Sequence, residues 1–191
     1  MIIGLTGRAR SGKDTVRQIL ERTYGFEGFA FADALKQAMV PLFGVDPRHL
    51  YDDKKKEQPI PGWGDLTMRR AMQLLGTEAM RGTFGDDFWI KRLRKEIYGK
   101  RMVVISDVRF DNEAAAIRNW GGAIVEVKRD GSGLQADAGA HVSEQGVSPY
   151  LVHLTIDNNS SLAMLQLTTE RAFTKLADAM HRLALEAQSY K

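Results

Sequence analysis

The sequence predicts an α/β fold of three layers, α/β/α, around a mostly parallel sheet. Three observations predict it. Short apolar segments of strand character alternate with amphipathic helical segments along the whole chain. The first of them, Ile2–Leu5, runs into a glycine-containing loop that opens a helix at Lys13. A chain of 191 residues is also long enough to build one such domain.

The remaining elements follow in order. Gly25 is expected to end the first helix, and Phe26–Phe31 is a short strand candidate. The later candidates are a helix within 31–44, two helices within 66–99 broken around 82–85, strands at 102–106, 123–128 and 151–156, and helices at 112–119 and 162–183. Residues 44–65 are polar and proline-rich, and either a mobile flap or a solvated insertion fits them. We expect one domain over 1–191, with a helical insertion at 44–100 and a lid at 129–150.

Composition narrows the functional classes. The net charge is +3, from 27 basic and 24 acidic residues, which is too small an excess to favour a stable nucleic-acid partner. The chain has no cysteine, so disulfides, zinc–thiolate sites and thiol catalysis are excluded. The apolar runs are too short to span a membrane, and we expect a cytoplasmic protein that binds small phosphorylated molecules.

The spacing Gly7-x4-Gly12-Lys13 fits the phosphate-binding pattern G-x-x-x-x-G-K-[ST]. Glycines let successive backbone N–H groups curl around an anion, and the helix that follows adds its partial positive charge. A glycine-rich turn that only caps a helix is the simpler alternative. Residues 7–13 are called the phosphate loop below. The residues expected to bind a phosphorylated cofactor are Gly7, Arg10, Ser11, Gly12, Lys13, Asp14 and Thr15.

One position departs from this pattern. Asp14 stands where Ser or Thr usually holds a magnesium ion, and Thr15 follows one place later. A carboxylate beside bound phosphates is repulsive unless a cation or water lies between, so Asp14 is interpreted as a metal-side residue. Thr15 is expected to donate its hydroxyl to phosphate and is a further candidate metal ligand. Asp107 ends the strand at 102–106, where the sheet is expected to bind its ligands, and is the candidate magnesium-orienting carboxylate. The alternative is that Asp107 caps the next turn.

A second group of polar residues recurs at helical spacing. Arg70, Gln73, Thr77 and Arg81 lie three or four places apart and are expected to share one helix face. Two guanidiniums with an amide and a hydroxyl between them could hold a phosphate and a base edge, although an ordinary solvated face has the same pattern. The further substrate-binding candidates are Asp33, which could instead be a helix cap, Lys36, which could be solvated, and Trp89, which could be core.

Residues 129–150 are rich in Gly and Ser and lie between two late strands, as a closing lid would. Arg129 would be the cationic tip of this lid, and Arg129 or Arg109 would neutralise charge on a transferring group. His141, Ser143 and Glu144 are too close together in the sequence to form a hydrolase triad. The nucleophile-elbow motif that would surround Ser143 is also absent.

The motifs GRARSGKDT, FADALK, MRRAMQLLGTEAMR with DDFW, VVISDVRFDNEAAAI and HVSE together resemble bacteriophage deoxynucleoside monophosphate kinases, over residues 1 to about 165. The resemblance implies the P-loop NTPase fold, ATP with Mg²⁺ as donor, a deoxynucleoside 5′-monophosphate as acceptor, a homodimer, and a role in DNA precursor supply in the host cytoplasm. The residues carried over by motif position are Lys13, Asp14, Thr15, Lys36, Arg70, Arg81, Trp89 and Asp107.

Two rival functions fit parts of the sequence. A dephospho-coenzyme A kinase has a similar loop and lid, but its hydroxyl acceptor needs a carboxylate base, for which Asp33 would serve. An NTP-hydrolysing switch or motor is disfavoured because the chain has no long basic tract and no evident partner surface. The residues do not indicate which bases are accepted.

Overall fold

The computed structural model describes residues 1–133 and 146–189, with the side chains of the C-terminal helix described as far as Arg182. Within them, five strands form one parallel sheet in the order β2-β3-β1-β4-β5. The strands are β1 (Ile2–Thr6), β2 (Glu27–Phe29), β3 (Val103–Ile105), β4 (Ala123–Lys128) and β5 (Leu154–Asp157). The predicted parallel sheet is confirmed, and all its strands end at the same edge.

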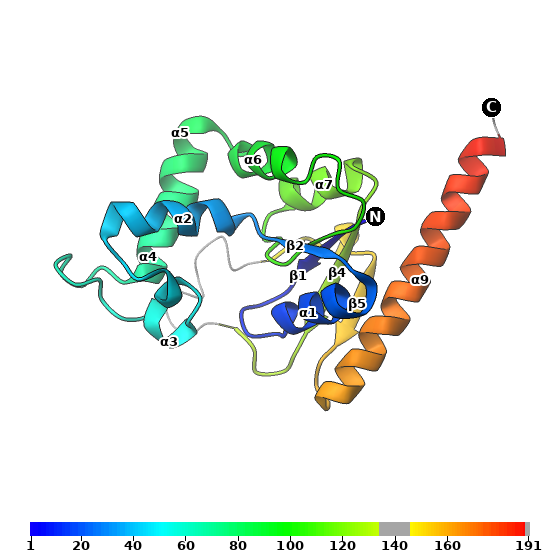
Figure 1. Cartoon of the computed structure of the whole chain (residues 1–191), viewed down its shortest axis with the longest axis horizontal. Helices are drawn as coiled ribbons and strands as arrows, with labels where there is room; N and C mark the ends of the chain where they lie inside the picture. The colour runs from blue at the N-terminus through cyan, green and yellow to red at the C-terminus, as the bar shows by residue number, and fades with distance from the viewer. Residues whose placement is uncertain (134–145, 190–191) are drawn as a thin grey trace.

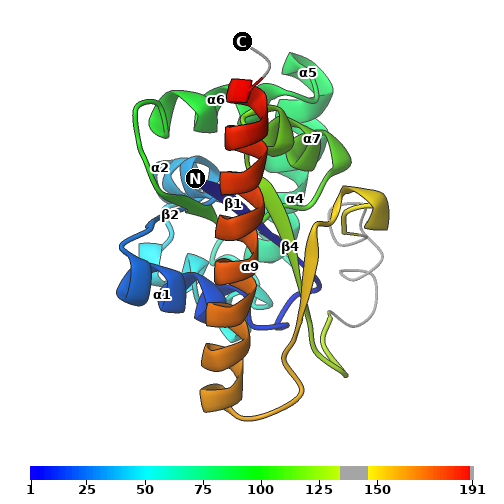
Figure 2. The ribbon, with the colours of Figure 1, turned by 90° about the vertical axis from the view of Figure 1, so that its right-hand side faces the viewer.

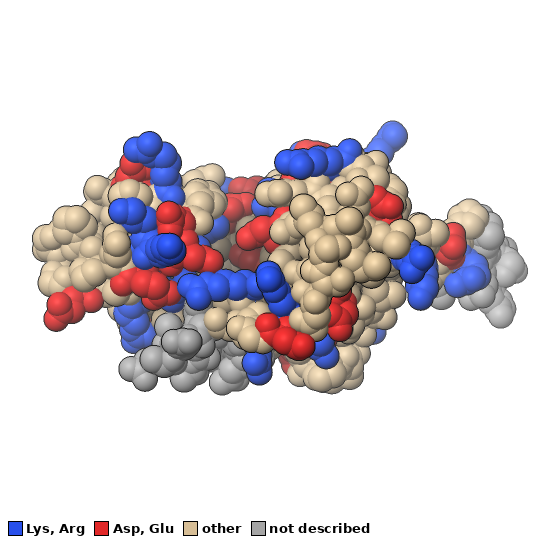
Figure 3. Space-filling model, turned by 90° about the horizontal axis from the view of Figure 1, so that it is seen from below, with Lys and Arg blue, Asp and Glu red and all other residues tan. Residues whose placement is uncertain are grey.

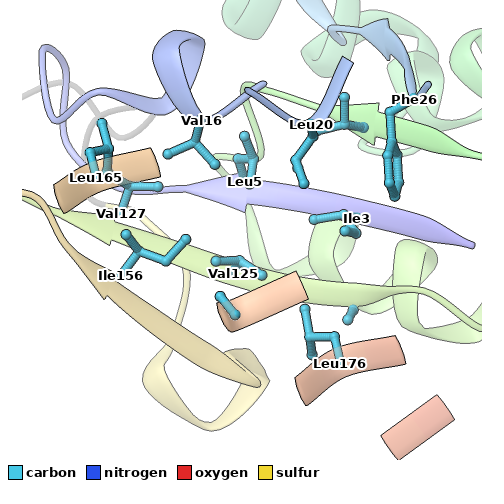
Figure 4. Packing of buried hydrophobic residues seen from close by; sticks show 13 residues of the cluster. Ile3, Leu5, Val16, Leu20, Phe26, Val125, Val127, Ile156, Leu165 and Leu176 are labelled. Carbon is cyan, nitrogen blue, oxygen red and sulfur yellow. The ribbon is translucent and has the colours of Figure 1, made fainter. Parts of the chain in front are cut away.

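Helices cover both faces of this sheet (Figures 1 and 2). On one face, Ile3 and Leu5 of β1 pack with α1 (Lys13–Tyr24) and α9 (Leu162–Ser189) in a fully apolar cluster (Figure 4). On the other face, Ile124 of β4 packs with residues of α6 (Phe88–Glu96) and α7 (Asp111–Asn119). Successive strand side chains point to opposite faces, so the predicted three-layer arrangement follows from the strand sequences.

The segment between β2 and α6 forms a separate lobe beside the sheet (Figure 1). Its helical elements are α2 (Ala32–Phe43), a 3₁₀ turn (Pro47–Leu50), α3 (Asp53–Lys56), α4 (Met68–Gln73), a π-helix (Leu74–Arg81) and α5 (Gly82–Phe84). Met39, Leu50, Ile60 and Met68 form the centre of a small apolar cluster within this lobe. Residues 44–65 are therefore anchored through Val45, Leu50 and Ile60 to a core that they share with α2 and α4.

Several predicted boundaries differ from the structure. The chain stays helical through Phe84 and turns at Gly85, whose φ of 101° suits glycine. The stretch 74–81 is a π-helix, which hydrophobic periodicity does not reveal. The strand expected from residue 151 begins at Leu154, because Pro149–Leu151 forms a 3₁₀ turn. Most of the expected lid, with His141, Ser143 and Glu144, lies outside the described residues.

None of the described helices, α9 included, is both apolar enough and long enough to pass through a membrane.

His153 extends the pairing of β4 with β5 by one residue. Its backbone N–H donates to the Ile124 carbonyl at 2.8 Å, and its ring Nδ1 accepts the Ile124 N–H at 3.0 Å. Burial, with a smaller contribution from Arg118, lowers the pKa of His153. The folded protein therefore disfavours the protonated ring, which could not accept this hydrogen bond.

We expect His153 to lower the free energy of unfolding as the pH falls below about 6.5, the pKa of an unfolded histidine. His153→Asn, which keeps an acceptor at the same position without titrating, should reduce this loss. Urea unfolding at pH 7.5 and 5.5 measures the difference, with His181→Asn on the exposed face of α9 as the control. Identical pH dependence in wild type and His153→Asn would contradict the assignment.

Candidate functional site

The phosphate loop joins β1 to α1 at the carboxyl edge of the sheet. Gly7 and Gly12 have φ angles of 130° and 105°, and Arg10 has a φ of 64°. A Cβ atom on Gly7 would lie 2.3 Å from the Val127 carbonyl oxygen. Glycine at this position is required by both the backbone conformation and the close approach of β4.

Polar groups of the loop are turned inward. Lys13 Nζ donates to the carbonyl oxygens of Gly7 and Arg8 at 2.9 and 2.8 Å. Ser11 is fully buried, and its hydroxyl has no hydrogen-bond partner among the described residues. Lys13 begins α1, whose N-terminal amides also face this loop. A lysine and a helix N-terminus that meet at a glycine-containing loop form a site suited to an anion.

A cavity of about 570 Å³ extends from the phosphate loop to the helical lobe. Eleven predicted site residues border it: Arg10, Lys13, Asp14, Asp33, Lys36, Gln73, Thr77, Arg81, Trp89, Asp107 and Arg109. Six predicted residues do not: Gly7, Ser11, Gly12, Thr15, Arg70 and Arg129. Three loop residues of this second group, Gly7, Ser11 and Gly12, shape the backbone beneath the cavity.

Asp107 connects the sheet to the helical lobe. One carboxylate oxygen accepts the Phe31 N–H at 2.7 Å, and the other accepts the Ala32 N–H at 2.9 Å. These are the amides of the N-cap residue and of the first residue of α2, so Asp107 caps a helix some 75 residues away in the chain rather than the turn that follows it. The carboxylate still borders the cavity, beside the phosphate loop residues Arg10 and Lys13.

Asp33 and Lys36 lie on the first turns of α2. Asp33 accepts the Ala30 N–H at 2.9 Å, so it bonds the backbone as the cap interpretation expected while also bordering the cavity. Lys36 Nζ lies 4.0 Å from Asp33 and 4.3 Å from the centre of the Tyr51 ring. Burial raises the pKa of Asp33 and lowers the pKa of Lys36. Lys36 is therefore a half-buried cation and not a solvated one.

The predicted arginine face is shifted by one residue. Arg70 is half exposed and pairs with Glu78 at 3.1 Å, and the structure does not bring it to the cavity. Arg69 is buried and borders the cavity, where its Nε lies 2.6 Å from Glu57 Oε1. In an α-helix, with about 3.6 residues per turn, two residues four apart are separated by slightly more than one full turn, as Arg69 and Gln73 are. In the wider π-helix, the same spacing is slightly less than one full turn, as for Gln73 and Thr77. The two rotations have opposite signs and nearly cancel. Arg69, and not Arg70, therefore lies on the same helix face as Gln73 and Thr77.

Arg81 borders the cavity but is held mainly by protein groups. Its guanidinium lies 3.9 Å from the centre of the Phe110 ring, and Nη2 lies 3.3 Å from both Asp86 and Asn112 oxygens. Nη1 lies 3.6 Å from Glu113 and has no hydrogen-bond partner among the described residues. The arginine is thus fixed in place, with one buried donor nitrogen unsatisfied.

Glu113 is a buried carboxyl group that the sequence pattern did not single out. It accepts the backbone N–H groups of Arg109 at 2.9 Å and Phe110 at 3.2 Å, and it lies 3.6 Å from Arg81. Burial is the main reason that its pKa rises to about 7, with Asp107 adding repulsion. An acidic residue at the third position of α7 is the usual companion of a helix start, which is the signal that could have identified it.

Of two further predicted site residues, Trp89 is packed in the core and Arg129 is exposed. The indole Nε1 of Trp89 donates to the Gly76 carbonyl at 2.8 Å, and its ring packs edge-on against Phe88 within the core. It is therefore a core residue, as the alternative held, that also borders the cavity. Arg129 is exposed just after β4 and lies outside the cavity.

Charges of both signs surround the cavity. Asp53 of α3 lies 3.6 Å from Arg10, 3.0 Å from Lys56 and 3.8 Å from Arg69. Figure 3, seen from below, shows basic and acidic side chains interleaved across this face. The described residues hold no group of three or more acidic or histidine side chains placed to ligate a metal ion. The sequence does not single out Asp53 and Lys56, because a charged run such as 52–57 is typical of any solvated loop. It does not single out Arg69 either, because the π-helix that follows α4 leaves no mark in hydrophobic periodicity.

A parallel sheet with a phosphate loop after its first strand, and a cavity between that loop and a helical lobe, is the arrangement of a P-loop α/β/α protein. Similar solved structures are a gluconokinase from Sinorhizobium meliloti (14% identical, TM-score 0.52, covering 95% of each chain) and a dephospho-CoA kinase from Campylobacter jejuni (12% identical, TM-score 0.50, covering 93% of this chain and 98% of the other). At these identities the likeness shows the fold alone.

Sequence comparison identifies the family. The deoxynucleotide monophosphate kinase family model matches residues 53–168. A protein of Acanthamoeba polyphaga mimivirus named as a deoxynucleotide monophosphate kinase is 31% identical over 178 residues, 85% of this chain and 90% of that one. The deoxynucleotide monophosphate kinase of Enterobacteria phage T4 is 29% identical over 119 residues, 60% of this chain and 45% of the phage protein. The chain belongs to the deoxynucleotide monophosphate kinase family.

We expect Glu113 to lower the free energy of unfolding as the pH rises. Its pKa of about 7 in the folded protein lies above the value of about 4.3 expected when it is unfolded, so the folded state binds the extra proton between these values. Stability from this group is therefore complete at low pH and is lost as the pH rises through 7.

Glu113→Gln, which stays neutral, should show a smaller loss of stability than the wild type between pH 5 and 7.5, measured by urea unfolding. Glu78→Gln, at an exposed position of the helical lobe, is the control and should follow the wild-type curve. Parallel curves for the wild type and Glu113→Gln would refute the expectation.

Proposed function

We propose that the chain transfers the γ-phosphoryl group of ATP to a deoxynucleoside 5′-monophosphate, with the two nucleotides meeting end to end in the cavity. The observation that carries this proposal is that one cavity is bordered by Lys13 at one end and by the polar face of the helical lobe at the other. The donor phosphates would lie on the phosphate loop and the N-terminus of α1. The acceptor would lie against Arg69, Gln73 and Thr77.

The acceptor chemistry fits the side chains present. A nucleoside monophosphate has a second pKa of about 6 and is largely dianionic at neutral pH, so its attacking oxygen needs no general base. It needs cations that offset the repulsion between two phosphate groups. Arg69 and Lys36 are buried or half-buried cations on two walls of the cavity, and they would supply that charge.

Magnesium would accompany ATP. Mg²⁺ usually takes one or two protein carboxylates and completes its shell with phosphate oxygens and water, so a cluster of three acidic groups is not required. Asp14, which directly follows Lys13, borders the cavity and would hold the ion with the donor phosphates. Thr15 does not border the cavity and stays a second candidate ligand. When bound, the ion neutralises charge on the transferring group. Asp107 would act beside them as the anchor of α2.

The proposed function also gives a role to two segments of the chain and includes its assembly. Residues 44–100 would form the acceptor-binding insertion, and 129–150 the lid, whose residues 134–145 lie outside the described part of the chain. The resemblance to the phage enzymes supports a homodimer and a role in supplying DNA precursors. Arg109, which borders the cavity, is the better placed of the two candidate arginines to face the transferring group.

Release of ADP from ATP and Mg²⁺, measured with each deoxynucleoside and ribonucleoside monophosphate and with dephospho-coenzyme A, tests the proposal. We expect turnover with at least one deoxynucleoside monophosphate and none with dephospho-coenzyme A. Lys13→Ala should lower turnover by at least about a hundredfold, because it removes a charge from the transferring phosphates. Turnover with dephospho-coenzyme A alone, or full activity of Lys13→Ala, would overturn it.

Two neighbouring arginines on α4 provide a matched pair of variants. Arg69→Ala should raise the KM for the acceptor about tenfold or more, since a charge-assisted hydrogen bond contributes about 1.5–3 kcal/mol. Arg70→Ala removes the same side chain from the solvent side and should change that KM by less than about twofold. Steady-state kinetics with varied acceptor at saturating ATP measure both. Equal effects of the two substitutions would exclude Arg69 from the acceptor site.

A further inference from the structure

A buried amide side chain supports the phosphate loop from below. Asn158 directly follows β5 and has only 9% of its surface exposed. Its Nδ2 donates to the Ser11 carbonyl oxygen at 2.8 Å, across 147 residues of chain. No local sequence pattern predicts a contact across this separation, so it depends on the tertiary structure.

The sheet holds Asn158 in place. Its backbone N–H donates to the Lys128 carbonyl at 2.7 Å, which continues the ladder between β4 and β5. The next residue, Asn159, accepts the Asp130 N–H with its Oδ1 at 2.7 Å on the exposed side. The position of the Asn158 side chain is therefore set by two paired strands and not by the loop that it contacts.

The loop is shaped to receive this side chain. A Cβ atom on Gly12 would lie 2.3 Å from Asn158 Nδ2, so any larger residue at position 12 would displace the amide. The Ser11 carbonyl precedes α1 and faces the buried interior, where the Asn158 amide satisfies it. Without that donor the carbonyl would be buried and unpaired, which is costly.

This hydrogen bond also orients an amide of the loop. The peptide group between Ser11 and Gly12 is planar and trans, so its N–H points away from the side to which its carbonyl points. When Asn158 holds the carbonyl inward, the Gly12 N–H is held in the opposite direction. The proposed function requires the donor phosphates to approach the loop from that side.

We propose that Asn158 is a positioning residue for the donor: its buried hydrogen bond to Ser11 holds the Ser11–Gly12 peptide in the orientation that binds phosphate. This inference rests on the proposed function, because it assumes that the phosphate loop binds the donor. It assigns a role in donor binding to a residue of the turn after β5, which does not border the cavity.

Asn158→Asp is the test, because it keeps the size of the side chain and replaces the donor NH₂ with an oxygen that repels the Ser11 carbonyl. We expect the KM for ATP to rise about tenfold, equivalent to about 1.4 kcal/mol. The KM for the acceptor should stay within about twofold of wild type. Asn159→Asp is the matched control: it adds the same charge one residue away, keeps an oxygen that accepts the Asp130 N–H, and should leave both KM values unchanged.

The affinity for ADP, measured by titration calorimetry, provides a second readout that does not depend on turnover. Asn158→Ser, which is too short to reach Ser11, replaces Asn158→Asp in both measurements if the aspartate variant does not fold. Wild-type affinity for ADP in the Asn158 variant would overturn the inference, as would equal increases in both KM values. A wild-type protein that neither binds ADP nor phosphorylates any nucleotide would instead refute the proposed function.

Discussion

The cavity depends on one carboxylate. Asp107 ends β3 at the carboxyl edge of the sheet and accepts both leading amides of α2. A helix N-terminus needs partners for its free N–H groups, and here a residue of the sheet provides them. The helical lobe is thereby attached at the point where the phosphate loop also leaves the sheet. Asp107 therefore ties the start of α2, one wall of the cavity, to the end of β3.

The second constraint is electrostatic. A site for two phosphorylated ligands needs several cations, and cations buried without partners are costly. Acidic residues hold them in this protein: Asp53 lies within 4 Å of Arg10, Lys56 and Arg69, and Glu113 faces Arg81. The pairs keep the guanidiniums in fixed positions at the edge of the cavity. Such pairing explains why a small net charge of +3 is compatible with a phosphate-binding cavity.

The two glycines of the phosphate loop each make room for a different contact. Gly7 allows β4 to approach, and Gly12 allows the Asn158 side chain to reach the loop backbone. The glycines therefore serve contacts beneath the loop as much as the curvature of the loop. The loop, the end of β4 and the turn after β5 form one hydrogen-bonded unit through Asn158, which bonds both Ser11 and Lys128. A ligand bound to the phosphate loop would therefore be connected to the sheet through these hydrogen bonds.

The sequence by itself determined the order of strands and helices along the chain, the phosphate loop and the polar face at Gln73, Thr77 and Arg81, because each depends on spacing within a short segment. Only the tertiary structure decided which neighbour of a pair faces the cavity. Arg69 and not Arg70 does so, because a π-helix changes the register after α4 and that change leaves no mark in hydrophobic periodicity. Asp107 caps α2, Glu113 faces Arg81, and Asn158 supports Ser11 across separations that no local pattern encodes. Long-range pairing of polar groups is settled by burial, since a carboxylate or amide removed from water must find its partner wherever the fold places one.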